Sequence, residues 1–313
     1  MAVSIVIRCC NEEKHIGRLL SGIMQQTIKD IDVVVVDSGS TDGTLSVADQ
    51  YPARIVSVNP EEFSFGRSLN LGCRQARGEF IVIASAHVYP VFNDWLEKLL
   101  VPFEDERVAL VYGKQRGNKG TKYSEHQIFG RWFPDSSNMC QDHPFCNNAN
   151  AAIRRQVWEK QRYDEQLTGL EDLDWAKRAM FHGFKVAYAA DAEVIHVHKE
   201  TPVQIYNRYR REAMAMRSIF PEQRFGLWDF IYLCVSNLIS DYYHALRDGV
   251  LMTNATGIPV FRFMQFWGTY RGYRQKGPVT RKLRETFYYP NGLKRSRQIS
   301  EERIQTRNYI DYD

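Results

Sequence analysis

Runs of consecutive apolar residues alternate with amphipathic segments over the first 115 residues of the chain. The apolar runs predict β-strands at residues 3–9, 32–37, 53–58 and 79–85. The segments between them place apolar residues at helical spacing, which predicts helices at residues 12–26, 41–51 and 66–76. Strands without polar alternation are buried on both faces, so the pattern indicates a mostly parallel sheet with flanking helices. In such doubly wound α/β folds, ligands bind beyond the carboxyl ends of the strands.

The remainder of the chain has two different patterns. Residues 108–200 are mixed, with a predicted strand at 108–115, a turn followed by a helix within 147–160, a helix at 167–183 and a pair of strands within 184–200. From about residue 203 the pattern is helical only, with predicted helices at 203–220, 227–249 and 260–277. We therefore predict an α/β domain at 1–202 and a helical C-terminal extension at 203–313.

Polar clusters follow three of the predicted strands where each strand ends. The first strand runs into Arg8, Asn11 and Glu12, the second ends in DSGSTDGT, and the fourth ends in Ser85-Ala-His87. A single polar cluster of this kind is usually a loop. Three clusters at one edge of a parallel sheet predict a shared crevice that binds a ligand.

Four stretches of the sequence carry a resemblance to a known family. They are SIVIRCCNEEKHI, VVVVDSGSTDGT, FGRSLNLGCRQARGEFIVIASAHVYP and GLEDLDWAKRAMFHGFKVAYAADAEVIHVH. In this order they resemble family-2 glycosyltransferases of the GT-A fold, especially bacterial enzymes that build cell-surface polysaccharides. The resemblance covers about residues 3–200. It implies a nucleotide-sugar donor, inversion at the anomeric carbon, a nucleotide-binding half at 1–115 and an acceptor half at 116–202.

The resemblance also implies donor-binding roles for residues near the first strands. Arg8, Asn11 and Glu12 would border the nucleoside, and the carboxylate of Asp37 would accept a hydrogen bond from the base or ribose. The alternative for Asp37 is a turn or helix-cap acid within DSGSTDG.

A donor-side helix is implied to carry Arg67 and Asn70, with a cation facing the donor diphosphate. The alternative is that both residues lie on an exposed helix face. Only the contact with the diphosphate requires both side chains to reach the crevice.

The fourth strand departs from the family pattern, which ends in Asp-x-Asp and holds a divalent ion. Here Ser85 and His87 occupy the aligned positions, and they offer Mg²⁺ a poor set of ligands. Three explanations remain open. The enzyme is metal-independent, with cations such as His87 and Arg67 stabilising the leaving phosphate; or His87, with His196 or His198, binds a softer ion such as Mn²⁺; or the site is inactive. The sequence thus makes neither Mn²⁺ nor Mg²⁺ a certain cofactor.

Acidic residues open the predicted helix near residue 171. The family's acceptor-side motif is intact as Glu171-Asp172, and we predict Asp172 to be the general base and Glu171 to orient the acceptor or a loop. Asp174 would point elsewhere. The alternative is that these acids only complement the helix dipole.

Two histidines end the last predicted strand. The two-residue period of a strand places His196 and His198 on one face, where they could bind a metal beside His87 or act as cationic donors to the diphosphate. We prefer His196 as the metal ligand that accompanies His87.

Charge and cysteine content add little that is specific. The net charge is +4, and residues 262–313 hold 12 Lys and Arg against 5 Asp and Glu. This basic end suits an anionic partner such as a membrane surface or a phosphorylated lipid, or is simply solvated. No signature of a nucleic-acid-binding fold is present. Six cysteines without a disulfide spacing indicate a reduced, cytoplasmic protein, and a zinc site at Cys140 and Cys146 lacks a second ligand pair.

Membrane contact is predicted from the C-terminal helices. The longest apolar run, FIYLCVSNLI, is too short to span a bilayer, and the N-terminus has no signal-peptide pattern. Residues 260–277 combine bulky apolar side chains with flanking bases, which is typical of an interfacial helix. The alternative is a helix packed on the catalytic domain or in a homodimer. Peripheral attachment to the inner face of the membrane is therefore one expected location.

We predict from these observations a transferase that moves a sugar to a surface-polysaccharide or lipid-linked glycan acceptor. The competing hypothesis is a catalytically degenerate homologue that binds nucleotides or carbohydrates, because Asp-x-Asp is missing.

Overall fold

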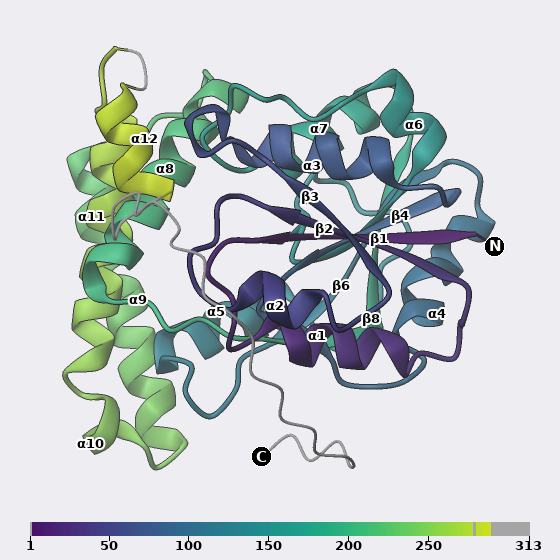
Figure 1. Ribbon diagram of the computed structural model, residues 1–313. Coiled ribbons are helices and arrows are strands. Elements are labelled where there is room, and N and C mark those ends of the chain that lie inside the picture. Colours follow the sequence, from purple (N-terminus) through teal and green to yellow (C-terminus); the bar gives the residue numbers. More distant parts are fainter. Residues whose placement is uncertain (1, 278–279, 289–313) are drawn as a thin grey trace.

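The computed structural model describes residues 2–277 and 280–288. The part of the basic C-terminal segment beyond residue 288 therefore lies outside the described residues. Its centre is an eight-stranded sheet with the order β3-β2-β1-β4-β7-β6-β8-β5 (Figure 1). The strands are β1 (Val3–Cys9), β2 (Ile31–Asp37), β3 (Ala53–Ser57), β4 (Phe80–Ser85), β5 (Val88–Pro90), β6 (Val108–Arg116), β7 (Asn150–Arg154) and β8 (Lys185–His196). Strands β1 to β4 are mutually parallel, and β7 runs antiparallel to β4 and β6. The predicted α/β fold is confirmed.

Helices cover both faces of the sheet, as Figure 1 shows. One face carries α1 (Ile16–Met24), α2 (Thr44–Ala48) and α4 (Trp95–Leu100), and the other carries α3 (Phe65–Gln75), α6 (Arg155–Lys160) and α7 (Glu171–Phe181). Two short 3₁₀ turns, η1 (Pro60–Glu62) and η2 (Val101–Glu104), and helix α5 (Tyr123–Trp132) complete this part of the chain.

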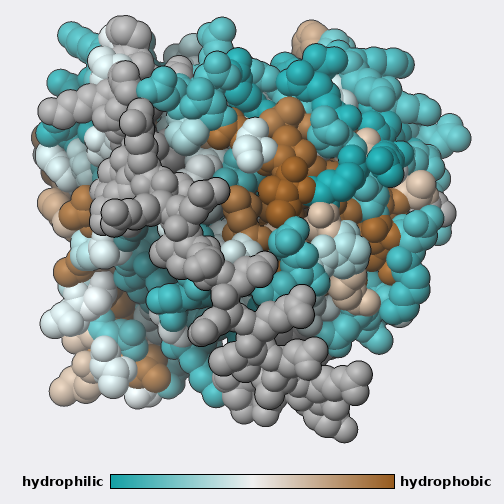
Figure 2. All heavy atoms as spheres, in the orientation of Figure 1, coloured by the Kyte–Doolittle hydropathy of each residue, from teal (hydrophilic) through white to brown (hydrophobic). Residues whose placement is uncertain are grey.

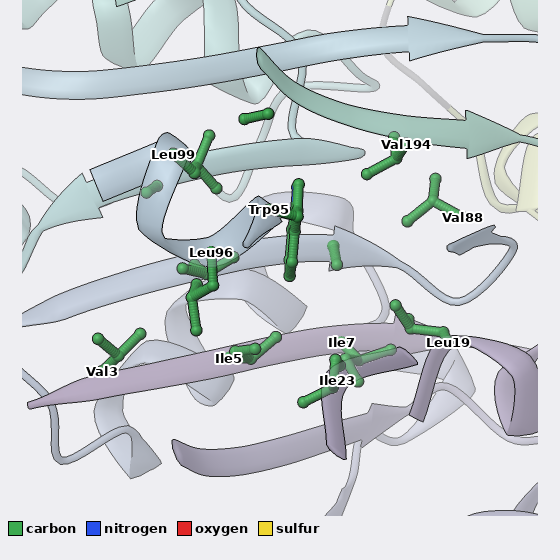
Figure 3. Packing of buried hydrophobic residues seen from close by; sticks show 14 of the residues in the cluster. Val3, Ile5, Ile7, Leu19, Ile23, Val88, Trp95, Leu96, Leu99 and Val194 are labelled. Atoms are coloured by element: carbon green, nitrogen blue, oxygen red, sulfur yellow. The ribbon is translucent and has the colours of Figure 1, made fainter. Parts of the chain in front are cut away.

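The two-residue period of the strands divides the core into two layers. Val3, Ile5 and Ile7 of β1 face the layer that contains Trp95 of α4 (Figure 3), whereas Val6 faces the layer of α3, α6 and α7. Both layers need apolar residues, so β1 is an uninterrupted apolar run. This double burial is the physical reason that the sequence pattern predicted a parallel sheet.

Two predictions about the strands were wrong. Residues 150–154 form β7, where a turn was predicted, because alanines with modest strand propensity are held between two neighbouring strands. Residues 185–196 form one long strand, not a pair, although the exposed Asp191 interrupts its apolar run. Strand β8 continues because β6 pairs with it along its length and β5 pairs with its end.

The C-terminal extension consists of helices grouped at one side of the sheet (left in Figure 1). They are α8 (Pro202–Ile219), α9 (Leu227–Arg247), α10 (Leu251–Asn254), α11 (Gly257–Tyr273) and α12 (Arg281–Tyr288). Thr201 and Gln204 form a capping box that starts α8. Gly268 and Gly272 of α11 lie against the backbone of α8, where a Cβ atom on either would collide with a carbonyl oxygen. The two helices therefore pack unusually closely.

A buried ion pair joins the extension to itself and to the α/β part. Arg262 of α11 binds Asp241 of α9 at 2.7 Å and also donates a hydrogen bond to the carbonyl oxygen of Ser124 in α5. Helix α11 buries Ile258 and Phe261. In the described residues it packs against other helices, which was the alternative to an interfacial helix.

Helix α9 exposes much of its apolar surface. Trp228 is 81% exposed and Ile239 is 63% exposed. Figure 2 shows brown and pale side chains at the lower left, over the region of α9 and α10. Among the residues that the structure describes, no helix combines the length and apolar character that a membrane span requires.

Candidate active site

A cavity of about 800 Å³ opens at the carboxyl ends of β1 and β4. The start of α7, the segment after β8 and one side of α8 enclose it. It brings together nine of the residues predicted from sequence: Arg8, Asn11, Glu12, Ser85, His87, Glu171, Asp172, His196 and His198. The cavity lies where a doubly wound sheet places its ligands.

The loop after β1 is tied to the loop after β2 by hydrogen bonds. Asn11 has a φ of +58°, a left-handed conformation that asparagine tolerates better than most residues. Its side-chain oxygen accepts the N–H of Thr41 at 2.8 Å, and the N–H of Glu12 donates to Thr44 Oγ1 at 2.7 Å. These bonds fix the direction in which the Glu12 side chain enters the cavity.

Asp37 is not part of the cavity lining, and its predicted donor contact stays a prediction. Its carboxylate is buried and accepts the backbone N–H groups of Gly39 and Ser40 at about 3 Å. Gly39 has a φ of +95°, so the carboxylate stabilises a turn that needs glycine. The position of Asp37 therefore matches the alternative of a turn acid.

Arg67 and Asn70 are also not part of the cavity lining, and their predicted contact with the diphosphate stays a prediction. Arg67 forms ion pairs with Glu62 and Glu165, at 2.7 and 3.1 Å. Asn70 is buried, donates to the carbonyl oxygen of Tyr163 at 2.9 Å and also binds Glu165. Both side chains fasten α3 to the segment around residue 165, and neither exposes its polar group to the cavity.

Asp172 sits in the first turn of α7, after Leu170 in a left-handed conformation. Its carboxylate accepts the backbone N–H of Asn148 at 2.9 Å and that of Leu173 at 2.8 Å. Burial, and then the neighbouring charge of Glu171, raise the pKa of Asp172 to about 7, against the effect of these hydrogen bonds. At neutral pH this carboxyl group can therefore both lose and accept a proton.

Arg8 balances the two acids at the start of α7. One guanidinium nitrogen lies 3.7 Å from a carboxylate oxygen of Glu171, and the guanidinium carbon lies 4.4 Å from the centre of the Phe65 ring. Burial lowers the pKa of Arg8, against the negative charges of Glu171 and Asp172. Arg8 thus places one positive charge beside two carboxyl groups inside the cavity.

Three histidine rings meet on the opposite wall of the cavity. The ring centres of His196 and His198 lie 4.0 Å apart, and that of His87 lies 5.0 Å from His196 and 5.7 Å from His198. His87 comes from the turn between β4 and β5, and the other two come from the end of β8 and the residues after it. The pairing of β5 with β8 brings these distant segments together.

Several cavity residues were not predicted as site residues. Arg208, Arg211 and Glu212 of α8 line it, and Arg208 binds Glu125 at 3.0 Å and Glu200 at 2.6 Å. The cluster of arginines among aromatic residues at 206–217 was the available signal for α8. Glu125 lies in a segment without a motif, so only the fold reveals that it approaches the site.

A second cavity of about 510 Å³ shares part of its lining with the first: Asn147, Leu170, Asp172, His196, His198, Arg208 and Glu212. It lies between α5, α8, α11 and the loop before β7, and aromatic side chains dominate its wall: Phe129, Trp132, Phe133, Phe145, Tyr209, Phe225 and Tyr273. Asp172 therefore lies between a polar compartment and an aromatic one.

Cysteines do not form a second candidate site in the described residues. All six cysteines are free, Cys140 is exposed, and burial raises the pKa of Cys146 well above its usual range. Within residues 2–277 and 280–288, the groups able to hold a metal ion are His87 with His196 and His198, and Glu125 with His198 and Glu200. The zinc hypothesis for Cys140 and Cys146 has no support here.

Solved structures share this fold at low sequence identity. A mannosyltransferase from Pyrobaculum calidifontis, solved with GDP-Man and Mn²⁺, is 20% identical, with a TM-score of 0.59 over 87% of this chain and 84% of that chain. TarS of S. aureus, solved as residues 1–349 with UDP, is 16% identical, with a TM-score of 0.52 over 87% of this chain and 91% of that chain.

Curated relatives include two bacterial rhamnosyltransferases. The O-antigen chain rhamnosyltransferase WbaN of Salmonella anatum is 31% identical over 196 residues, which is 59% of this chain and 62% of the relative. The O-antigen chain rhamnosyltransferase RfbN of Salmonella typhimurium is 28% identical over 67% of this chain and 70% of the relative. The match to WbaN thus spans less than two thirds of that protein.

The family model for glycosyl transferase family 2 matches residues 4–161, about half of the chain. This region contains β1 to β7 and the loop residues that line the polar cavity from the sheet side. The match shows that this chain belongs to glycosyl transferase family 2.

Proposed function

We propose that this protein is an inverting glycosyltransferase that moves rhamnose from a nucleotide-activated donor to a surface-polysaccharide or lipid-linked glycan. The names of the two O-antigen relatives support the sugar and the type of acceptor. The observation that carries the proposal is the position of Asp172 at the junction of two cavities, with its pKa raised to about 7.

The polar cavity suits the donor. Asn11 and Glu12 border it where the nucleoside would lie, and Ser85 and His87 stand at the end of β4 where the diphosphate would lie. Arg8 and Arg208 add positive charge to the same cavity. A diphosphate needs such cationic surroundings because its charge increases as the bond to the sugar breaks.

The aromatic cavity suits the acceptor. Its side chains offer flat apolar surfaces, against which the apolar face of a sugar ring can pack. An acceptor held there would lie near Asp172, which lines both cavities. Inversion requires attack and departure on opposite faces of the anomeric carbon.

Asp172 would act as the general base. Its carboxylate accepts the proton of the attacking hydroxyl group while the new bond from that oxygen to the anomeric carbon forms. The bond from the anomeric carbon to the diphosphate oxygen breaks, and the electron pair leaves with the nucleoside diphosphate. Glu171 would hold Arg8 in place through their ion pair and so position the positive charge beside the reaction.

A divalent ion forms part of this proposal. The solved mannosyltransferase with GDP-Man contains Mn²⁺, and the three-histidine cluster here lies in the donor cavity. The metal-independent explanation named His87 and Arg67 among other cations. Arg67 is paired with Glu62 and Glu165 and is not part of the cavity lining, whereas Arg8 and Arg208 are. A bound Mn²⁺ would neutralise the departing diphosphate, and Mg²⁺ fits imidazole ligands less well.

The proposed location follows from the acceptor. A lipid-linked glycan would bring the enzyme to the inner face of the cell membrane, and the exposed apolar side chains of α9 would then contact the bilayer surface. Homodimerisation through the same helix is the competing prediction. Vesicle binding and sedimentation velocity distinguish membrane contact from homodimerisation.

Replacing the proposed base tests the function. Asp172→Asn should lower kcat for transfer from a nucleotide-activated sugar by about 10²- to 10⁴-fold, because the carboxamide cannot accept the proton. The assay measures nucleoside diphosphate release across a panel of nucleotide sugars that includes activated rhamnose, with bacterial membrane extracts as the acceptor source.

Asp174→Asn is the matched control. Asp174 lies in the same helical turn, pairs with Arg178 at 2.8 Å and is not part of the polar cavity's lining. This variant should keep turnover within a factor of about two, as is usual for surface changes. Equal turnover by Asp172→Asn and wild type would refute the role of Asp172 as the base, and no consumption of any donor would favour the degenerate binding homologue.

A further inference from the structure

The strongest unassigned feature is the second set of contacts around the three histidines. Each ring has its Nδ1 atom 2.7 Å from an oxygen of another side chain: His87 from Glu12, His196 from Gln115, and His198 from Glu125. A carboxylate or amide oxygen accepts a hydrogen bond, so Nδ1 carries the proton in all three rings. The lone pair then resides on Nε2.

One of these Nε2 atoms is buried without any partner. His196 is 5% exposed, and its Nε2 has no hydrogen-bond partner within the described part of the chain. A buried nitrogen with an unused lone pair is costly, since it has lost its hydrogen bond to water. A ligand that accepts this lone pair would remove the cost.

We propose that His87, His196 and His198 together hold one divalent transition-metal ion through their Nε2 atoms, while Glu12, Gln115 and Glu125 orient the three rings. One nitrogen from each histidine lies within 4.8 Å of the others. Three ligands of a tetrahedral zinc ion lie about 3.3 Å apart for bonds near 2.0 Å. Small rotations of the rings about their side-chain bonds close this difference.

The neighbouring acidic group is a poorer candidate. Glu125, His198 and Glu200 also lie within the same distance of one another. Both carboxylates, however, bind Arg208, at 3.0 and 2.6 Å. That guanidinium already binds both carboxylates, so they are poorer metal ligands than the imidazoles, and Glu125 also contacts the His198 ring.

An all-imidazole site selects its metal differently from a carboxylate pair. Imidazole nitrogen prefers borderline ions such as Mn²⁺, Co²⁺ and Zn²⁺, whereas Mg²⁺ prefers oxygen ligands and retains its water. Three protein ligands also leave coordination positions open, which diphosphate oxygens of the donor could fill. The inference thus deepens the proposed function by naming the ligands and the class of ion.

Cobalt binding tests the site without any need for catalysis. The full-length protein is treated with EDTA, dialysed and titrated with Co²⁺, whose visible absorption reports nitrogen coordination. We expect one Co²⁺ per chain and at least about tenfold weaker binding in His87→Ala and in His198→Ala. Glu12→Ala should weaken binding by about 10- to 100-fold through the orientation of His87. Millimolar Mg²⁺ should not displace the bound ion.

His182→Ala is the matched control, because His182 is exposed at the end of α7 and lies outside the cluster. It should bind Co²⁺ as the wild type does, and circular dichroism should show the same fold in every variant. No uptake of Co²⁺ by the wild type, equal losses in His182→Ala and His87→Ala, or displacement by Mg²⁺ would overturn the site. Stoichiometric Co²⁺ binding without sugar transfer would refute the proposed function and leave the metal site standing.

Discussion

The carboxyl group of Asp172 owes its properties to its surroundings. Two backbone N–H groups hold it, Glu171 stands beside it, and burial raises its pKa to about 7. A free aspartate titrates near pH 4 and would be a weaker base at the same pH. The raised pKa matches what general-base catalysis needs near neutrality.

A pH profile tests this description of Asp172. The base must be ionised to accept a proton, so kcat/KM should rise with pH and level off above about 7. Glu171→Gln removes the neighbouring negative charge that helps raise the pKa of Asp172, so the acidic limb should move to lower pH. Rates measured from pH 5 to 9 check both expectations. Asp174→Asn should leave the limb in place, and an unshifted limb in Glu171→Gln would contradict the assigned coupling.

The site residues differed in how well the sequence predicted their position. Glu171 and Asp172 sit in a motif at a helix start, and the polar residues after β1 and β4 stand at strand ends, so their shared cavity could be predicted. Asp37 and Asn70 stand in equally plausible motif positions, but their polar groups satisfy backbone and side-chain partners of the fold. A sequence gives the type of each residue but does not show which partner its polar group binds in the folded protein.

At the level of elements, one buried ion pair links helix α9 to helix α11. Arg262 and Asp241 are 3% and 1% exposed, and two guanidinium nitrogens meet the two carboxylate oxygens. Removing one partner leaves an uncompensated charge in the interior, which is far more costly than the intact pair is stabilising.

Asp241→Asn should lower the free energy of unfolding by about 3–5 kcal/mol, because it leaves the Arg262 charge buried without a counter-ion. Urea unfolding followed by circular dichroism measures the loss. The matched control is Asp94→Asn, which removes an exposed pair with Lys98 at 3.9 Å and should cost about 0–1 kcal/mol. A similar, small loss in both variants would show that the α9–α11 contact does not depend on this pair.

Short elements were harder to predict than the long strands β1 to β4, and helix α5 was not predicted at all. The apolar runs of β1 to β4 are long and continuous, so periodicity alone identified them. Strand β7 has the short sequence NAAIR, and β5 has three residues, so neither has a period of its own. They exist because neighbouring strands offer unpaired backbone groups, a long-range condition that local sequence cannot express.

For the whole molecule, the C-terminal extension is part of the active site. Helix α8 supplies Arg208, Arg211 and Glu212 to the polar cavity, and α11 supplies Thr269 and Tyr273 to the aromatic one. Side chains from both sides of the predicted boundary at residue 202 therefore line the two cavities.

The exposed side of α9 leads to a prediction about the whole protein. Ile239→Asp should reduce binding to vesicles of phosphatidylethanolamine and phosphatidylglycerol by about tenfold, since burying one isoleucine contributes about 1.5–3 kcal/mol. Co-sedimentation with vesicles measures the bound fraction.

The control for Ile239→Asp is Phe181→Asp, at a residue that is 86% exposed on α7. It should leave vesicle binding unchanged. Wild-type protein that stays in the supernatant, together with an Ile239→Asp variant that changes from dimer to monomer in sedimentation velocity, would assign the surface to a homodimer.

The sequence alone determined the α/β class, the family and the group of polar residues at one sheet edge. These properties are local, because strand burial, helix spacing and short motifs are written in consecutive residues. Tertiary structure decided which of these residues face the cavity, that β5 and β8 bring three histidines together, and that Glu12, Gln115 and Glu125 orient them. The hydrogen bonds of the three histidines join residues 73 to 81 positions apart. Only the folded chain determines which distant side chains meet.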